Sequence, residues 1–236
     1  MREFSICSLS DQSLLIQLAD EISKEGNTKV QAVYQYLKNN PIEGIRSITP
    51  AFSTVSIQYD VFAVKKHAKS LSAYAYLYNK IEHILDQIEI KTKENKGKII
   101  EVPVCYDEEF ALDLNEVSQA KSMSINEVIK RHSEQEYYTY MLGFSPGFPF
   151  LGGLDESLEM PRKKTPRTQI PKGSVAIAGK QTGIYSLSSP GGWQIIGKTP
   201  LTLYDFEKTP PTLIQMGDTV RFIPIDKNEF NALIGK

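Results

Sequence analysis

Positive charge without nearby acid marks one stretch of the chain as a candidate anion-binding surface. Residues 160–204 contain no Asp or Glu. They contain seven basic residues, namely Arg162, Lys163, Lys164, Arg167, Lys172, Lys180 and Lys198. Arg162 and Arg167 each follow a proline, and arginine holds a carboxylate or phosphate through two parallel hydrogen bonds. Both are therefore candidate catalytic residues. The alternative is a solvated basic loop that pairs with acids elsewhere in the fold.

Three phenylalanines lie among glycines and prolines in residues 143–153, which read GFSPGFPFLGG. A loop this rigid loses little conformational entropy when it is held in one shape. Phe144, Phe148 and Phe150 are therefore candidates for an apolar wall that binds a substrate or a protein partner. The alternative is a structural turn whose phenylalanines belong to the hydrophobic core.

Polar side chains next to glycine turns form a third candidate group. The segments QTGIY and SPGGW contain Gln181, Thr182, Tyr185 and Trp193, the single tryptophan of the chain. A few polar groups beside aromatic rings are typical of a small-molecule pocket. The sequence equally fits a β-hairpin with a tryptophan in the core.

His132 is a candidate for proton transfer, because histidine titrates near neutral pH. The alternative is a histidine at the end of a helix, where its charge interacts favourably with the helix dipole. No set of Cys, His and Asp residues has the spacing of metal ligands, so we expect no metal site.

Residues 192–199, GWQIIGKT, match the phosphate-binding pattern GxxxxGK[ST]. A true P-loop opens a helix whose first N–H groups face the phosphates. Here Pro200 follows, and residues 201–206 resemble a strand. The match is therefore expected to be accidental.

Periodicity predicts strands at residues 4–9, 13–18, 45–49 and 54–59, and helices at 22–37 and 71–90. This order, ββαββα, indicates a small α/β sandwich with both helices on one face of an antiparallel sheet. The charged residues 91–98 are expected to form a linker, or alternatively an exposed hairpin. The first domain would then be residues 1–95.

The second domain, residues 96–236, contains most of the glycines and prolines, which punctuate short elements. A strand is predicted at 99–104, and capping-box patterns at Asp113 and Ser124 predict two short helices. Further strands are predicted at 137–142, 174–177, 183–185, 193–196, 201–206 and 219–225. Together they indicate a closed barrel or a sandwich, and the whole chain belongs to the α+β class.

Composition excludes several classes of protein. The formal net charge of −1 argues against a nucleic-acid binder, which usually has a basic excess. Two cysteines are too few for a disulfide framework and indicate a reducing compartment. No apolar run reaches the roughly 18 residues of a membrane helix, and the N-terminus does not resemble a signal peptide. We therefore expect a cytoplasmic protein.

Taken together, the segments MLGFSPGFPFLGGL, PRKKTPR, IPKGSVAIAGKQTGIY and SPGGWQIIGKTP, with His132 and Tyr138, strongly resemble one family. It includes the B subunit of 5-oxoprolinase, the sporulation kinase A inhibitor and the first subunit of allophanate hydrolase, and corresponds to subdomains C and D of a carboxyltransferase domain. The resemblance implies a cyclophilin-like β-barrel after the small α/β domain. Ser174 and Thr199, within the matching segments, complete the candidate binding residues.

The resemblance also implies an enzyme made of several proteins. The partners would be a homologue of the 5-oxoprolinase C subunit, of the carboxyltransferase A/B type, and an A subunit of the LamB/YcsF type. The complex would use ATP to hydrolyse 5-oxo-L-proline to L-glutamate, and this chain would be inactive alone. From the chemistry of arginine and the absence of acids in this stretch, and not from the resemblance, we expect Arg162 and Arg167 to hold the substrate carboxylate or a phosphoryl group.

Two other functions remain open at this point. The chain could be a non-enzymatic inhibitor that docks its phenylalanine-rich loop on a histidine kinase and blocks autophosphorylation. It could also be one component of an allophanate hydrolase or another carboxyltransferase-type enzyme. Co-purification with the C-subunit homologue would discriminate these functions.

Overall fold

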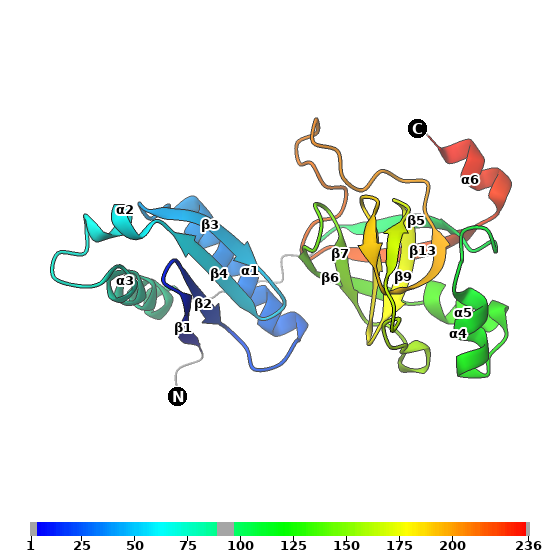
Figure 1. Cartoon of the computed structure of the whole chain (residues 1–236), viewed down its shortest axis with the longest axis horizontal. Coiled ribbons are helices and arrows are strands. Elements are labelled where there is room, and N and C mark those ends of the chain that lie inside the picture. The colour runs from blue at the N-terminus through cyan, green and yellow to red at the C-terminus, as the bar shows by residue number, and fades with distance from the viewer. Residues whose placement is uncertain (1–3, 89–96, 235–236) are drawn as a thin grey trace. The chain divides into compact units, whose positions relative to one another are not determined.

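The computed structural model of the chain describes residues 4–88 and 97–234, which fall into two compact units (Figure 1). The first unit comprises residues 1–95 and the second residues 96–236. Most of the predicted linker, residues 91–96, lies outside the described residues.

The first unit is a four-stranded antiparallel sheet with strand order β1-β2-β4-β3. Its elements are β1 (Ser5–Ser10), β2 (Ser13–Gln17), α1 (Lys24–Asn39), β3 (Ile45–Pro50), β4 (Thr54–Tyr59), α2 (Val61–Lys65) and α3 (Ala73–Gln87). The predicted ββαββα order is therefore confirmed. The short helix α2 was not predicted, and it begins where the Asp60 carboxylate accepts hydrogen bonds from the Phe62 and Ala63 N–H groups.

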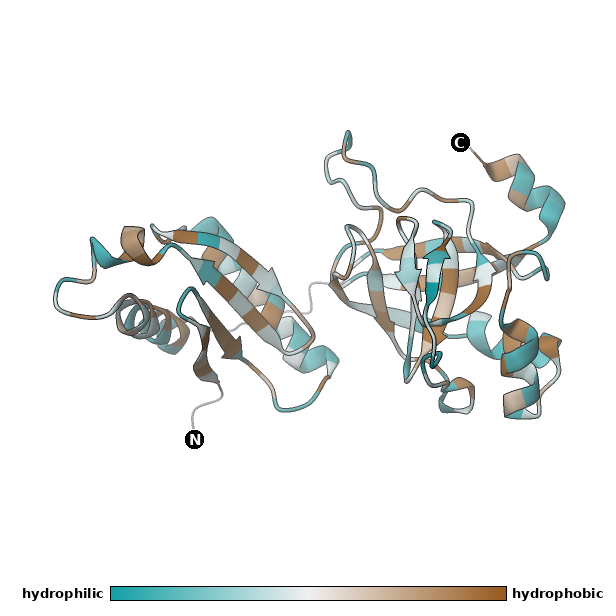
Figure 2. Cartoon of the chain, viewed as in Figure 1, coloured by the Kyte–Doolittle hydropathy of each residue, from teal (hydrophilic) through white to brown (hydrophobic). Residues whose placement is uncertain are grey.

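One face of this sheet and both long helices share a single hydrophobic core. The core joins Leu14, Ile16, Val55 and Ile57 of the sheet with Val30, Val33 and Leu37 of α1 and with Leu77, Ile81 and Leu85 of α3. Figure 2 shows the matching alternation of hydrophobic and hydrophilic residues along β4. Since successive side chains of a strand point to opposite faces, the hydrophobic residues of this pattern all lie on one face of the sheet.

Both helices of the first unit begin later than periodicity predicts. The hydroxyls of Ser23 and Ser72 each accept a backbone hydrogen bond from the first turn, and so act as N-caps. Ile22 and Leu71, the first residues of the two predicted helices, precede these caps and are exposed. Local capping therefore overrode the hydrophobic pattern.

The second unit is built on a barrel. Its elements are β5 (Ile99–Cys105), α4 (Leu114–Lys121), α5 (Ile125–Ser133), β6 (Glu136–Leu142), β7 (Pro149–Gly152), the 3-10 turn η1 (Glu156–Leu158), β8 (Arg167–Ile170), β9 (Ser174–Ala178), β10 (Gln181–Ile184), β11 (Ser189–Gly191), β12 (Gln194–Lys198), β13 (Thr219–Ile225) and α6 (Lys227–Leu233). Within the described residues, seven strands close in the order β10-β7-β6-β13-β5-β12-β9, while β8 and β11 form a separate pair. The α+β class and the barrel are thus confirmed.

The predicted strand at residues 201–206 is wrong. This segment has one isolated bridge, between Tyr204 and Thr212, and otherwise forms a loop. Pro200, Pro210 and Pro211 flank the segment or face it, and proline lacks the N–H that a strand ladder needs. The short elements β7, β8, β11 and α6 were not predicted.

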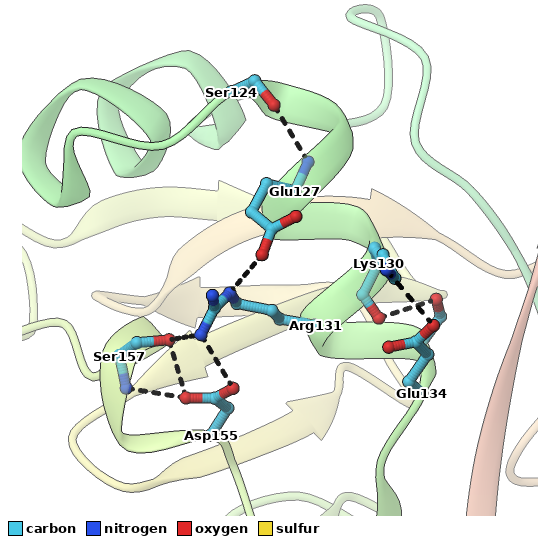
Figure 3. Close-up of polar contacts among 8 residues, drawn as sticks. Ser124, Glu127, Lys130, Arg131, Glu134, Asp155 and Ser157 are labelled. Atoms are coloured by element: carbon cyan, nitrogen blue, oxygen red, sulfur yellow. Dashed lines mark hydrogen bonds and ion pairs between the residues drawn. The ribbon is translucent and has the colours of Figure 1, made fainter.

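Of the two predicted capping patterns, only that at Ser124 caps its helix. The Ser124 hydroxyl accepts a hydrogen bond from the Glu127 N–H at 3.2 Å. The Glu127 carboxylate accepts from Arg131, whose guanidinium also contacts Asp155 and Ser157 and so ties α5 to η1 (Figure 3). Asp113 makes no side-chain cap, because its carboxylate is used elsewhere.

Candidate functional site

A pocket of about 330 Å³ opens in the second unit, where three of the sequence segments singled out above meet. The residues expected there that do line it are Phe144, Phe148, Phe150, Arg162, Tyr185 and Trp193. The structure thus brings together the phenylalanine-rich loop, the basic loop and the glycine turn before Trp193. We call this hollow the aromatic pocket.

The wall of the aromatic pocket is a cluster of rings centred on Phe148. Its ring centroid lies 5.2 Å from that of Tyr185 and 5.5 Å from that of Trp193, both edge to face. Phe148 is 1% exposed, whereas Phe144 is 65% exposed and has a φ of 62°. Phe148 therefore belongs to the core, as the alternative interpretation has it, whereas Phe144 is presented to solvent.

Two glycines make room for these rings. A Cβ at Gly183 would lie 2.8 Å from the Phe148 ring, and one at Gly191 would overlap the Tyr185 hydroxyl. Burial raises the pKa of Tyr185, although a hydrogen bond from the Trp193 backbone and the charges of Arg162 and Arg167 oppose this shift. Tyr185 is therefore a neutral hydroxyl at neutral pH.

Arg167 is held in an ion pair and does not line the aromatic pocket. Its guanidinium donates two hydrogen bonds, of 2.8 and 2.7 Å, to the two carboxylate oxygens of Asp113. Lys163 also pairs with Asp113 at 2.8 Å and with Glu116 at 2.8 Å. The alternative interpretation, that the basic loop pairs with acids distant in the sequence, holds for these two residues.

Asp113 is 2% exposed and also accepts a hydrogen bond from the Ile195 N–H at 2.7 Å. Burial by itself would raise the pKa of Asp113. The hydrogen bonds from Arg167 and Lys163 outweigh burial and lower this pKa below its usual value. Asp113 therefore stays ionised as a buried anion shared by two cations.

Arg162 differs from its basic neighbours. It is exposed, it lines the aromatic pocket, and the described part of the chain places no carboxylate in an ion pair with it. An unpaired guanidinium beside an apolar cavity suits a ligand with a carboxylate on a small apolar body. Of the two arginines expected to act on substrate, only Arg162 has this freedom.

His132 lies in the interior of the second unit, away from the aromatic pocket, and is 0% exposed. Its ring stacks on Phe222 with centroids 4.5 Å apart. Its Nδ1 and Nε2 atoms lie 2.8 Å from the Tyr106 hydroxyl and 3.0 Å from the Thr182 hydroxyl. Burial lowers the pKa of His132 from 6.5 to about 3. His132 is therefore a neutral ring enclosed in the second unit, and the proton-transfer role expected from sequence stays a prediction.

The other four candidate binding residues do not line the aromatic pocket. Ser174, Thr182 and Thr199 are buried, and the Thr182 hydroxyl donates to the Ala176 carbonyl. Gln181 begins β10 and is partly buried. These residues belong to barrel strands or their ends, and the structure gives them a part in the scaffold.

The segment that matched the P-loop pattern does not fit ATP phosphates. Residues 194–198 form strand β12, and the Lys198 ammonium lies over the Phe110 ring at 5.4 Å. No helix begins at Lys198, so this segment forms no phosphate cradle. Among the described residues, no group of three or more His, Cys, Asp and Glu side chains could hold a metal ion.

Sequence reasoning missed Asp113 and Glu116 as members of the site. Their spacing is that of a capping box, although Asp113 lies 54 residues from the arginine it binds. The acid-free composition of residues 160–204 did contain a signal, because such a stretch must either bind an external anion or recruit acids from elsewhere. Here Lys163 and Arg167 recruit such acids, whereas Arg162 has no ion pair among the described residues.

The family of the chain is shown by its match to a model of the carboxyltransferase domain, subdomain C and D. The match covers residues 4–214. This chain belongs to that family. The resemblance carried by the glycine-rich and proline-rich segments is thereby confirmed.

Within the family, the B subunit of 5-oxoprolinase from Bacillus subtilis (strain 168) is 42% identical to this chain over 231 residues. The alignment covers 97% of this chain and 96% of the relative. A crystal structure of a conserved uncharacterized protein from Pyrococcus horikoshii is 39% identical, covers 96% of this chain and 100% of its own, and superposes with a TM-score of 0.56.

The urea carboxylase of Kluyveromyces lactis shares the fold. It is 19% identical, and its TM-score is 0.78 over 98% of this chain and 22% of the larger enzyme. At this identity the similarity concerns architecture alone. Across the described residues, every helix is too short or too polar to cross a bilayer.

Proposed function

We propose that this chain is the B subunit of an ATP-dependent 5-oxoprolinase, which hydrolyses 5-oxo-L-proline to L-glutamate. The observation that carries the proposal is the aromatic pocket with Arg162 as its unpaired cation. 5-Oxo-L-proline is a compact five-membered ring that bears one carboxylate. The relationship to the Bacillus subtilis protein over nearly both full lengths supports the same activity.

The pocket would contribute binding and orientation. The rings of Phe148 and Trp193 would pack against the apolar face of the lactam, and Arg162 would hold its carboxylate. A lactam carbonyl is a poor electrophile, and ATP would transfer its terminal phosphoryl group to the lactam oxygen with release of ADP. Water would then add to the carbonyl carbon and inorganic phosphate would leave. Cleavage of the ring C–N bond, with protonation of the nitrogen, would yield glutamate. Because the segment that matches the P-loop pattern forms a strand, the proposal assigns ATP to the assembled complex.

The remaining machinery would come from partners. We propose a homologue of the 5-oxoprolinase C subunit, of the carboxyltransferase A/B type, and an A subunit of the LamB/YcsF type, with this chain inactive alone. The exposed Phe144 could then close the pocket against one of these partners, because an exposed aromatic side chain beside a cavity is typical of interfaces.

The test is reconstitution with both partners, followed by an assay of ATP-dependent glutamate formation. Arg162→Gln removes a charged hydrogen bond without breaking an ion pair. We expect KM for 5-oxo-L-proline to rise about 10- to 100-fold, which corresponds to the ~1.5–3 kcal/mol of such a bond. Lys164→Gln is the matched control, because Lys164 is exposed in the same loop but does not line the pocket.

Two outcomes would overturn the proposal. One is a reconstituted complex that does not hydrolyse 5-oxo-L-proline but acts on allophanate or transfers carboxyl groups. The other is tight binding to a histidine kinase dimerisation domain with no turnover in any complex. An Arg162→Gln complex with unchanged KM would reject the assigned role of that arginine alone.

A further inference from the structure

We propose that Asp113 is a positioning residue that sets the charge selectivity of the aromatic pocket, so that the pocket accepts small monoanionic ring acids and discriminates against dianions. The proposal concerns the pocket to which the proposed function assigns the substrate, and deepens that function by naming the class of ligand. Asp113 itself does not line the pocket. It acts through the basic loop.

The first step is geometric. Asp113 holds the Arg167 guanidinium through both carboxylate oxygens and the Lys163 ammonium at 2.8 Å. Its backbone N–H also donates to the Ile195 carbonyl at 2.8 Å, and its carboxylate accepts from the Ile195 N–H. One residue at the start of α4 therefore fastens the basic loop to strand β12.

The same loop is tied to the glycine turn that forms part of the pocket wall. The Lys163 N–H donates to the Gly192 carbonyl at 2.7 Å, and the Gln194 side chain donates to the Pro161 carbonyl at 3.0 Å. Lys163 and Gly192 both line the pocket. These bonds hold the backbone of the loop against the pocket wall, and Asp113 fixes the side chains of Lys163 and Arg167.

The second step is electrostatic. Arg162 and Lys163 are the cations among the described lining residues. Lys163 has two acidic partners, Asp113 and Glu116, and Arg167 shares the first of these. Two carboxylates thus balance two cations, and Arg162 is left as the one uncompensated charge of the lining.

One free cation beside an apolar cavity fits one anionic group. A second negative charge on the ligand would lose its hydration and find no cation to pair with in the pocket. Burial of an unpaired charge costs free energy. The charge of a phosphoryl group must then be met outside this pocket, by another protein of the complex. Asp113 achieves this selectivity by withdrawing Lys163 and Arg167 from the ligand.

The test uses the full chain and its single tryptophan, Trp193, which lines the pocket and so reports occupancy by fluorescence. The probes are cyclopentanecarboxylate and trans-cyclopentane-1,2-dicarboxylate, which share a ring and differ in charge. The wild type should bind the monoanion more tightly. In Asp113→Asn the affinity ratio should shift toward the dianion by about tenfold, and added salt should reduce the shift.

The ratio of the two affinities separates charge selection by Asp113 from a purely structural role of Asp113. A loosened pocket would weaken the binding of both probes by the same factor and leave the ratio unchanged. Asp155→Asn is the matched control: Asp155 also pairs with an arginine (Figure 3) but does not line the pocket, so the ratio should stay that of the wild type. If Asp113→Asn does not fold, Glu116→Gln replaces it. Glu116 is exposed, and its loss frees Lys163 in part, so a smaller shift in the same direction is expected.

An unchanged ratio in the Asp113 variant, or in Glu116→Gln where the former does not fold, overturns the inference. So does a wild-type chain whose Trp193 emission responds to neither acid. Failure of the proposed function is recognised separately, as a reconstituted complex without 5-oxoprolinase activity in which this chain still shows the shift in charge selectivity.

Discussion

Two hydrogen bonds of His132 identify its tautomer. The Thr182 hydroxyl donates its single proton to the Ala176 carbonyl, so it can only accept from the Nε2 atom of His132. The proton of the neutral ring is therefore on Nε2, and Nδ1 accepts from the Tyr106 hydroxyl. Every polar atom of this buried group is satisfied by the uncharged ring, which explains why protonation is disfavoured.

This arrangement predicts an acid-sensitive stability. The pKa of His132 is about 3 in the folded chain and 6.5 when unperturbed. Between these values the unfolded chain binds a proton that the folded chain does not, so stability falls as pH is lowered. From about pH 7 to about pH 5 the loss from this residue is about 2 kcal/mol in the free energy of unfolding.

Urea unfolding at both pH values measures this loss. His132→Gln removes the titrating group, so the variant should be less stable at neutral pH but should lose less stability on acidification. Equal pH dependence in the two proteins would show that His132 is protonated in the folded state.

At the scale of elements, the turn that leads from β11 into β12 shapes the pocket. A Cβ on Gly191 would overlap the Tyr185 hydroxyl and lie 2.8 Å from the Ile170 side chain. A Cβ on Gly192 would find its nearest neighbours at 3.6 Å, which is ordinary contact. The close approach of Tyr185 and Ile170 therefore requires glycine at position 191, whereas there is room for a Cβ at position 192.

We predict that Gly191→Ala lowers the free energy of unfolding by about 1–3 kcal/mol, as overpacking of a filled core does. Gly192→Ala is the control and should change it by less than about 0.5 kcal/mol. Denaturation followed by circular dichroism measures both. Adding Tyr185→Phe to Gly191→Ala should restore part of the loss, because the hydroxyl is the closest obstacle; no restoration would place the strain elsewhere.

At the scale of the whole molecule, the two units have separate cores. The core of the first is built from residues of its sheet and of α1, α2 and α3, and the two clusters of the second are built from residues after position 101. We propose residues 1–95 and 96–236 as two domains. Each is large enough to fold on its own core.

The fragment of residues 97–236 is therefore expected to fold in isolation. Its Trp193 emission should match that of the full chain, because the described ring contacts of Trp193 are with Phe148 and Phe150 of the same unit. Circular dichroism and cooperative unfolding of the fragment measure this. A fragment without a cooperative transition would contradict the division.

Local signals in the sequence predicted most of the elements. Hydrophobic periodicity located α1 and α3, and alternation located the strands of the first sheet, because these patterns depend on neighbours a few residues away. The same logic failed at residues 201–206, where an alternating run has no partner strand. It also missed β7, β8 and β11, which are short and rich in glycine and proline.

The sequence by itself determined the two-part organisation, the barrel-forming second half, and the rigid aromatic loop beside a basic one. Only the tertiary structure decided which cation is free. Arg162 and Arg167 look alike in the sequence, each following a proline. Closure of the barrel brings Asp113 to Arg167 and leaves Arg162 unpaired within the described residues, since ion pairing depends on distance in space, which local pattern does not encode.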